Sequence, residues 1–253
     1  MHRFLGFLSF KAKCLNSKCL AQISFVGIEL GQERILKFDL RNVQKSLLEV
    51  ERNWKKIDDK LDLEKLGRRD TFDSVIRGRM MDAYNHLDAL LRKGVEPFSV
   101  DGISEILELN NVVLYGSNLT LRLEYNQAIQ ANSDKFMEYI GPIEKWYRSH
   151  MKGEPHPLKV AAEVYVAVLG FPQLFIEGNH RTGNLISNWI SMYYGHPPFV
   201  LSVETAVAYF KPSKEIKRFA DKSTWRGRAR LPKYRDSFKK FWEENIDDKY
   251  VEA

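Results

Sequence analysis

The sequence predicts a mainly α-helical protein with a small β element near its N-terminus. Apolar residues recur at helical spacing over most of the chain, and strand-forming residues cluster only between 23 and 40. The 253 residues suffice for one large domain, or for one domain with a smaller appendage. Because the chain holds 15 Phe, 11 Tyr and 5 Trp, it can fill a sizeable core, which excludes a disordered protein.

The N-terminal region differs in pattern from the rest. Residues 23–30 and 35–40 are rich in strand formers, and the intervening 31–33 suit a hairpin turn. Helical spacing begins at Asn42, so we expect residues 1–60 to form an extension with a β-hairpin and a helix. The apolar run 4–10 is short and lysines follow it, so we do not expect export.

The remainder predicts a helical domain over residues 70–245. Glycine and proline mark several helix ends: Gly94 follows one helix, Pro157 opens another, and Gly195 ends a third. The conformation of 118–131 stays open between strand and helix. The expected helices cover residues 71–93, 97–110, 133–152, 157–169, 182–194 and 233–246.

Charge is unevenly distributed along the chain. The net charge is +6, yet residues 211–240 hold twelve Lys and Arg against three Asp and Glu. This segment predicts either a solvated helical surface or a contact with nucleic acid. No apolar run is long enough to cross a membrane. Two cysteines, Cys14 and Cys19, fit a reducing compartment, so we expect a cytoplasmic protein.

The segment 171–184 carries the most chemical information. Gly178 and Gly183 frame a short polar turn where a helix is expected to begin. Backbone N–H groups at a helix N-terminus bind phosphate oxygens, and Arg181 adds a fork of donors. Glu177 lies beside this anion site, where phosphate repels a carboxylate unless a cation such as Mg²⁺ lies between them. The turn therefore predicts a site for a metal-bound polyphosphate; the alternative is a polar loop capped by Asn179.

The same stretch resembles the signature of Fic-domain proteins, H-P-F-x-D/E-G-N-G-R-x-x-R. The matching positions are Phe175, Glu177, Gly178, Asn179 and Arg181. The likeness extends back to 156–162 and forward to 195–198, so that it covers about residues 70–245. It implies a Fic-fold helical bundle, with the motif in a loop that joins two helices.

The resemblance also implies an activity, which is transfer of AMP from ATP to a hydroxyl of a target protein. Glu177 would bind Mg²⁺, and Arg181 would hold the distal phosphates. Phosphate groups would further meet the turn formed by Gly178, Asn179, His180, Thr182 and Gly183. Such contacts stabilise the charge that develops during transfer.

The chain departs from the signature at four positions. Gln173 stands where the family has the histidine that deprotonates the attacking hydroxyl, and Leu174 replaces the proline after it. An amide cannot store that proton, and losing a general base costs roughly 10²–10⁴-fold in rate, although Gln173 can still orient a hydroxyl. His180 replaces a glycine and is a candidate displaced base, a phosphate contact or a plain loop residue. Asn184 replaces the closing arginine.

Two further family features are altered. Residues 73–78 resemble the segment that carries an inhibitory glutamate, but Arg77 stands in its place. Since Asn184 also replaces the arginine that this glutamate would pair with, we expect no such autoinhibition. The family's target-clamping flap corresponds to residues 118–131, so the target protein stays unassigned.

Three functions therefore compete. The first is nucleotidyl transfer to a protein, with Gln173 or His180 in place of the usual base. The second is a catalytically inactive protein that binds a nucleotide or regulates a partner. The third is nucleic-acid binding through residues 211–240.

Overall fold

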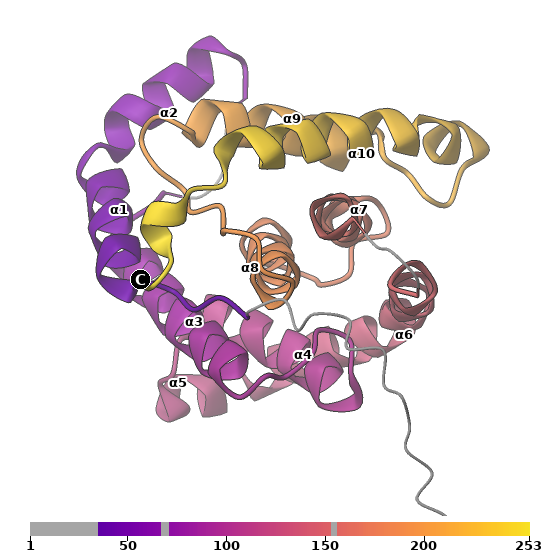
Figure 1. Cartoon of the computed structure of the whole chain (residues 1–253), viewed down its shortest axis with the longest axis horizontal. Coiled ribbons are helices and arrows are strands. Elements are labelled where there is room, and N and C mark those ends of the chain that lie inside the picture. Colours follow the sequence, from indigo (N-terminus) through magenta and orange to yellow (C-terminus); the bar gives the residue numbers. More distant parts are fainter. Residues whose placement is uncertain (1–34, 67–70, 153–155) are drawn as a thin grey trace, which may run out of the picture. The chain divides into compact units, whose positions relative to one another are not determined.

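A computed structural model describes residues 35–66, 71–152 and 156–253, within one compact unit. These residues form ten α-helices and no strand, which confirms the mainly α fold class (Figure 1). None of their helices has both the length and the apolar character needed to traverse a bilayer. The helices are α1 Leu40–Arg52, α2 Trp54–Leu63, α3 Ser74–Arg92, α4 Val100–Tyr115, α5 Leu119–Glu124, α6 Asn126–His150, α7 Pro157–Leu169, α8 Asn179–Tyr193, α9 Ala206–Phe219 and α10 Trp225–Asn245, followed by the 3-10 turn η1 Asp248–Tyr250.

The expected β-hairpin does not form in the part of the chain that the structure describes. Its first strand, 23–30, lies outside the described residues. Within 35–40, Phe38 makes a single antiparallel bridge with Val251, and α1 already begins at Leu40. The helix starts there because Asp39 caps it, accepting hydrogen bonds from the backbone N–H groups of Arg41 and Asn42.

Caps and glycines set several helix ends. Helix α3 begins three residues later than expected because Asp73 caps it, accepting from the N–H of Ile76, and Gly94 follows its end as expected, with a φ of +67°. The helix expected at 157–169 forms over those residues, with Pro157 in its first turn and His156 as its cap. These boundaries depend on local chemistry that the sequence displays.

Other boundaries differ from the predictions. Residues 118–131 are helical, forming α5 and the beginning of α6. Helix α8 begins three residues earlier than expected, and α9 was not predicted. Prolines 142, 212 and 232 lie inside α6, α9 and α10. A proline removes one helical hydrogen bond, but the buried face of α9, which includes Tyr209 and Ile216, offsets that cost.

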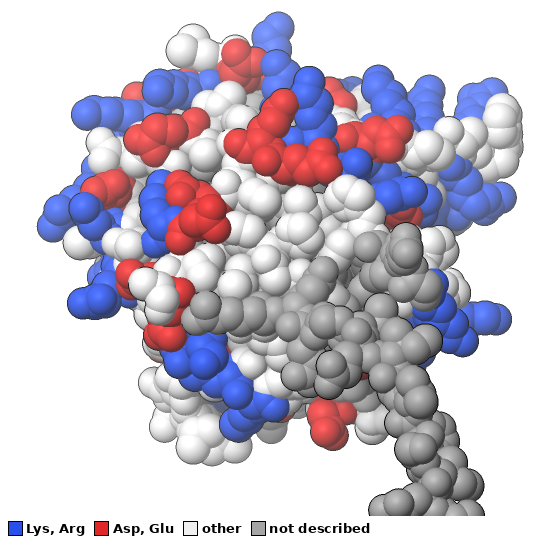
Figure 2. Space-filling view, viewed as in Figure 1, with Lys and Arg blue, Asp and Glu red and all other residues white. Residues whose placement is uncertain are grey.

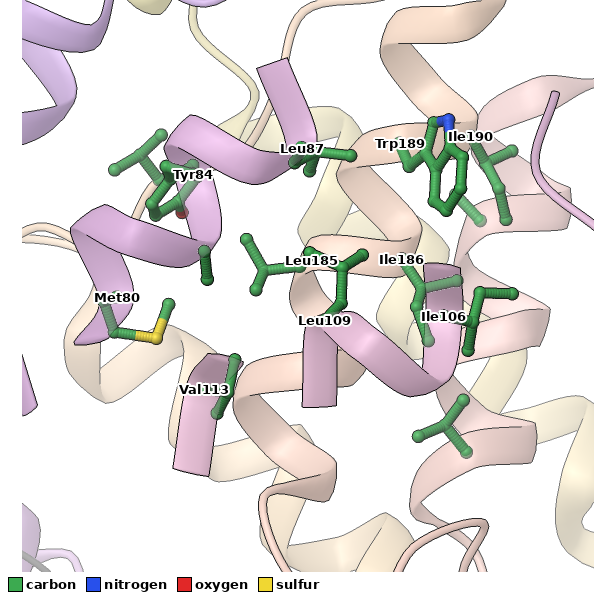
Figure 3. Close-up of a cluster of buried hydrophobic side chains, with 14 of the residues drawn as sticks. Met80, Tyr84, Leu87, Ile106, Leu109, Val113, Leu185, Ile186, Trp189 and Ile190 are labelled. Carbon is green, nitrogen blue, oxygen red and sulfur yellow. The ribbon is translucent and has the colours of Figure 1, made fainter. Parts of the chain in front are cut away.

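Helix α8 occupies the centre of the fold, with α3, α4 and α7 packed around it (Figure 1). Buried side chains from α3, α4 and α8 interdigitate in the main cluster shown in Figure 3, and those labelled are Met80, Tyr84, Leu87, Ile106, Leu109, Val113, Leu185, Ile186, Trp189 and Ile190. A second cluster joins α7 to α9 and α10 through rings that include Tyr165, Phe199 and Phe238. Both clusters include residues of α7, and the first also includes residues of α8, so the loop between these helices rests on a rigid base.

Candidate functional site

The loop between α7 and α8 is anchored at its start. The N–H of Phe171 donates to the carbonyl of Ala220 at 2.8 Å, and the N–H of Lys222 donates back to the carbonyl of Phe171 at 2.7 Å. Farther along, Leu174 and Phe175 are buried, and the Phe175 ring stacks on Phe136 with centroids 5.5 Å apart. The segment that resembles the Fic signature is therefore held firmly between helices.

Two buried asparagines bind the middle of the loop. The side-chain amide of Asn110 donates to the Glu177 carbonyl at 3.0 Å and to the Thr182 hydroxyl at 2.9 Å. Asn132 donates to Oδ1 of Asn110 at 2.8 Å and accepts from the N–H of Ile176 at 2.9 Å. Sequence reasoning did not identify this pair; the available signal was a polar Asn110 at helical spacing from the apolar Ile106 and Val113.

Gly178 makes the turn into α8 in the left-handed region, with φ of +76°. A Cβ at this position would lie 2.8 Å from Nδ2 of Asn110, so both conformation and space require glycine. The first hydrogen bond of α8 runs from the N–H of Thr182 to the Gly178 carbonyl. The N–H groups in the first turn of any helix have no helical acceptor, which is why helix N-termini can bind phosphate.

The Asn179 side chain braces the loop. Its oxygen accepts from the N–H of Phe175 and its nitrogen donates to the Phe175 carbonyl, both at 2.9 Å. The residue is buried, so a phosphate at this turn would meet its backbone N–H and not its side-chain amide.

His180 is joined to α7 and α9. Its Nδ1 lies 3.2 Å from the Tyr165 hydroxyl, while the Tyr209 hydroxyl donates to the His180 carbonyl. The Tyr165 hydroxyl also contacts the hydroxyls of Tyr209 and Ser213, at 3.0 Å and 2.8 Å, so it joins His180 to a network of buried hydroxyl groups. Imidazole is a common general base, so His180 has the chemistry that the amide of Gln173 lacks.

Glu177 and Arg181 lie on the wall of one cavity of about 640 Å³. The Arg181 guanidinium also donates to the Val113 carbonyl at 3.3 Å, which ties it to α4. Most of the other lining residues belong to α3, α4 and α6, and Tyr125, which joins α5 to α6, also lines the cavity. The other lining residues are Thr71, Asp73, Ile76, Arg79, Leu114, Tyr115, Tyr125, Ala128, Asn132 and Ile176.

This cavity combines cations, carboxylates and aromatic rings. Arg79 faces the same space as Arg181, and Asp73 is a second carboxylate beside Glu177. Tyr115 and Tyr125 stack with centroids 5.3 Å apart. Burial raises the pKa of the Tyr115 hydroxyl, and the Glu177 carboxylate raises it further, so Tyr115 stays neutral near pH 7.

The remaining predicted site residues lie away from the cavity. Among the described residues, those lining it include neither Gln173 nor His180. Gln173 donates its amide to the Leu169 carbonyl at 3.2 Å. Thr182 and Gly183 are buried, and a Cβ on Gly183 would lie 3.2 Å from the Tyr165 ring. Of the predicted residues, Glu177 and Arg181 alone have side chains at the cavity.

The segment resembling the inhibitory helix also reaches this cavity. It forms the first turns of α3, from which Asp73, Ile76 and Arg79 line the space. Arg77 instead forms an ion pair with Glu51 of α1. Asn184 is buried, and its Oδ1 has no hydrogen-bond partner in the described part of the chain. The family's glutamate–arginine ion pair therefore cannot form between these positions, because position 77 holds an arginine and position 184 holds a neutral asparagine.

The donor set fits a magnesium ion that phosphates help to bind. The described residues contain no group of three or more His, Cys, Asp or Glu arranged for a metal. Mg²⁺ in nucleotide sites commonly uses one or two carboxylates and takes its other ligands from phosphates and water. Glu177 and Asp73 are carboxylates of this kind at the cavity wall.

Two lysines that sequence reasoning did not single out also border the loop. Nζ of Lys222 donates to the Ala167 carbonyl at 2.6 Å, and Nζ of Lys135 donates to the Phe175 carbonyl at 3.0 Å. Burial, with a smaller effect from Lys135, lowers the pKa of Lys222 to about 8.

Comparison with known proteins agrees with this geometry. Over 130 residues the chain is 31% identical to protein adenylyltransferase fic-1 of Caenorhabditis elegans and 29% identical to protein adenylyltransferase fic-1 of Caenorhabditis briggsae. These matches support a relationship to the Fic family. They cover 48% of this chain, which spans only about a quarter (25%) of the length of each relative. No family model and no solved structure matches the chain.

Proposed function

We propose that this Fic-related chain binds ATP, or a similar nucleotide, with Mg²⁺ at the start of α8. The observation that carries the proposal is the shared cavity of Glu177 and Arg181, both from the signature-like turn. One related protein is named a protein adenylyltransferase, and that name agrees with a nucleotide as the ligand. The second candidate is a catalytically inactive member that binds the nucleotide for regulation.

The phosphates would lie between the N-terminus of α8 and the two arginines. Backbone N–H groups and the partial positive charge of the helix end favour an anion there. Arg181 of α8 and Arg79 of α3 line the same cavity and supply guanidinium donors. Mg²⁺ would be held by Glu177, with Asp73 near it, and would offset the charge of the phosphates.

The stacked tyrosines offer a place for the base. Tyr125 is 49% exposed and lies on the same cavity as Arg181. An aromatic ring can stack on a nucleobase, and stacking of this kind contributes about 1–3 kcal/mol. Phosphate and base contacts together would orient a whole nucleotide, not a phosphate ion alone.

The proposed transfer joins a target hydroxyl oxygen to the α-phosphorus as the bond to pyrophosphate breaks. A base must take the hydroxyl proton. Gln173 cannot do so, while His180 carries an imidazole but does not line the cavity. We therefore propose impaired or altered catalysis, in which His180 accepts the proton when the target is bound.

Two observations favour the binding-only alternative. The Gln173 amide is hydrogen-bonded to the end of α7. Residues 118–131 are helical, so they do not provide the strand that a flap needs to pair with a target segment.

The first test is calorimetry with ATP and MgCl₂ on the full chain. We expect Arg181→Ala to weaken ATP binding roughly 10- to 100-fold, the loss of a charged hydrogen-bond donor. The control is Arg41→Ala, an arginine on α1 whose side chain is 95% exposed. Equal ATP affinity of wild type and Arg181→Ala would contradict the proposed phosphate contact.

The second test separates transfer from binding. ATP labelled at the α-phosphate is incubated with the protein and cell lysate, and label on protein is measured. Incorporation that survives Gln173→Ala but disappears in His180→Ala supports the displaced base. Binding without incorporation supports the regulatory alternative, and a gain on Gln173→His would show that only the base was missing.

A further inference from the structure

The turn between α9 and α10 carries a dense group of exposed cationic and aromatic side chains. We call this surface the hairpin tip. Figure 2 shows Lys and Arg gathered where Figure 1 places the end of these two helices. The residues of the hairpin tip, all exposed, are Lys217, Arg218, Phe219, Trp225, Arg226, Arg228, Arg230 and Lys233.

The positive charge of the hairpin tip is not compensated by ion pairs. Elsewhere in α9 and α10 the cations have acidic partners, such as Arg235 with Glu163 and Lys239 with Glu243. Among the described residues, no carboxylate forms an ion pair with Lys217, Arg218, Arg226, Arg230 or Lys233. Such a concentration of one sign attracts a polyanion.

The aromatic side chains lie within this charge. Trp225 is 70% exposed and Phe219 is 38% exposed. The Arg226 guanidinium lies 5.8 Å from the centre of the Trp225 ring. Arg218 and Arg230 lie 5.0 Å and 6.0 Å from the centre of the Phe219 ring. Guanidinium planes beside aromatic rings provide flat surfaces on which bases stack.

The backbone beneath the hairpin tip is held in one arrangement. Thr224 caps α10 by accepting from the N–H of Gly227, where a Cβ would lie 1.8 Å from the Asp221 carbonyl. Arg228 donates to the carbonyls of Lys222 and Ser223. A preorganised surface loses less conformational entropy when it binds a ligand.

We propose that the hairpin tip binds single-stranded nucleic acid, with its cations on phosphates and Trp225 stacked on a base. A membrane surface is the less favoured partner for two reasons. Guanidinium groups lie over both exposed rings, so neither Phe219 nor Trp225 is an uncovered apolar anchor for insertion. Four of the six exposed cations are arginines, which bind phosphate with paired donors. The proposal is independent of ATP binding at α8.

The test measures fluorescence anisotropy of a labelled 20-nucleotide oligouridine with the full chain at 50 to 200 mM salt. We expect Trp225→Ala to lower affinity roughly 5- to 100-fold at constant salt, with an unchanged salt slope. The double variant Arg226→Ala/Arg230→Ala should reduce the slope of log affinity against log salt by about 1.4. The control is Arg41→Ala/Lys55→Ala, two exposed cations on α1 and α2.

Three outcomes would overturn the proposal. The first is no binding of oligouridine at 50 mM salt. The second is binding that neither hairpin-tip variant weakens more than the control does. The third is cosedimentation with phosphatidylserine vesicles without any RNA binding, which would assign the surface to membranes. All substituted side chains are exposed, so circular dichroism should confirm unchanged folding.

Discussion

Replacing Asn110 by alanine should loosen the turn on which the proposed nucleotide site depends. The Asn110 side chain is fully buried and joins three groups: the Glu177 carbonyl, the Thr182 hydroxyl and the Asn132 amide. Alanine removes all three hydrogen bonds and leaves buried polar partners without replacements.

The expected size follows from these contacts. A buried hydrogen bond contributes about 0.5–1.5 kcal/mol net, and a partner left unsatisfied costs about 1–3 kcal/mol. Local relaxation will recover part of this, so we expect Asn110→Ala to lower the free energy of unfolding by about 2–4 kcal/mol. The amide hydrogen of Ile176 donates to Asn132, which loses its hydrogen bond to Asn110 in this variant. This hydrogen should therefore exchange faster with solvent.

The assay is urea denaturation followed by hydrogen exchange of the peptide that contains residues 175–182. Asn111→Ala is the matched control, because Asn111 is adjacent and buried, and its side-chain amide makes only a long hydrogen bond of 3.5 Å to Glu108 within the described residues. We expect a smaller loss for this control. If both variants lose equal stability, or if exchange at Ile176 does not change in Asn110→Ala, the reasoning about the asparagine pair is wrong.

Two further predictions concern the surroundings of the loop. Gly183→Ala should lower the free energy of unfolding, measured in urea, by about 1–3 kcal/mol. The added methyl would meet the Tyr165 ring, which stacks on Phe238 with ring centres 3.9 Å apart. Unchanged stability would mean that these rings move freely. Lys222→Met tests the lowered pKa of Lys222. Between pH 8 and 10 the unfolded chain binds more protons than the folded one, so wild-type stability should rise with pH relative to Lys222→Met, by at most about 1.4 kcal/mol per pH unit. A difference between the two proteins that does not vary with pH would contradict the shift.

The sequence alone determined those features that arise from neighbouring residues. The span of α7 follows from Pro157, its apolar face and the glycine after it. This prediction succeeded because helix entry at proline, helical periodicity and glycine at a helix end depend on local chemistry. The likeness to the Fic signature likewise rests on one short continuous segment.

The tertiary structure decided the rest, because it depends on residues distant in sequence. Asn110 and Asn132 hold the turn from α4 and α6, and Arg79 and Tyr125 complete the cavity wall opposite Arg181. Helix α9 continues through Pro212 because its buried face packs on α7 and α10, and residues 35–40 adjoin the C-terminus and α1 where a strand was expected. Packing energy outweighed local preference at each of these places, and no single stretch of sequence contains that information.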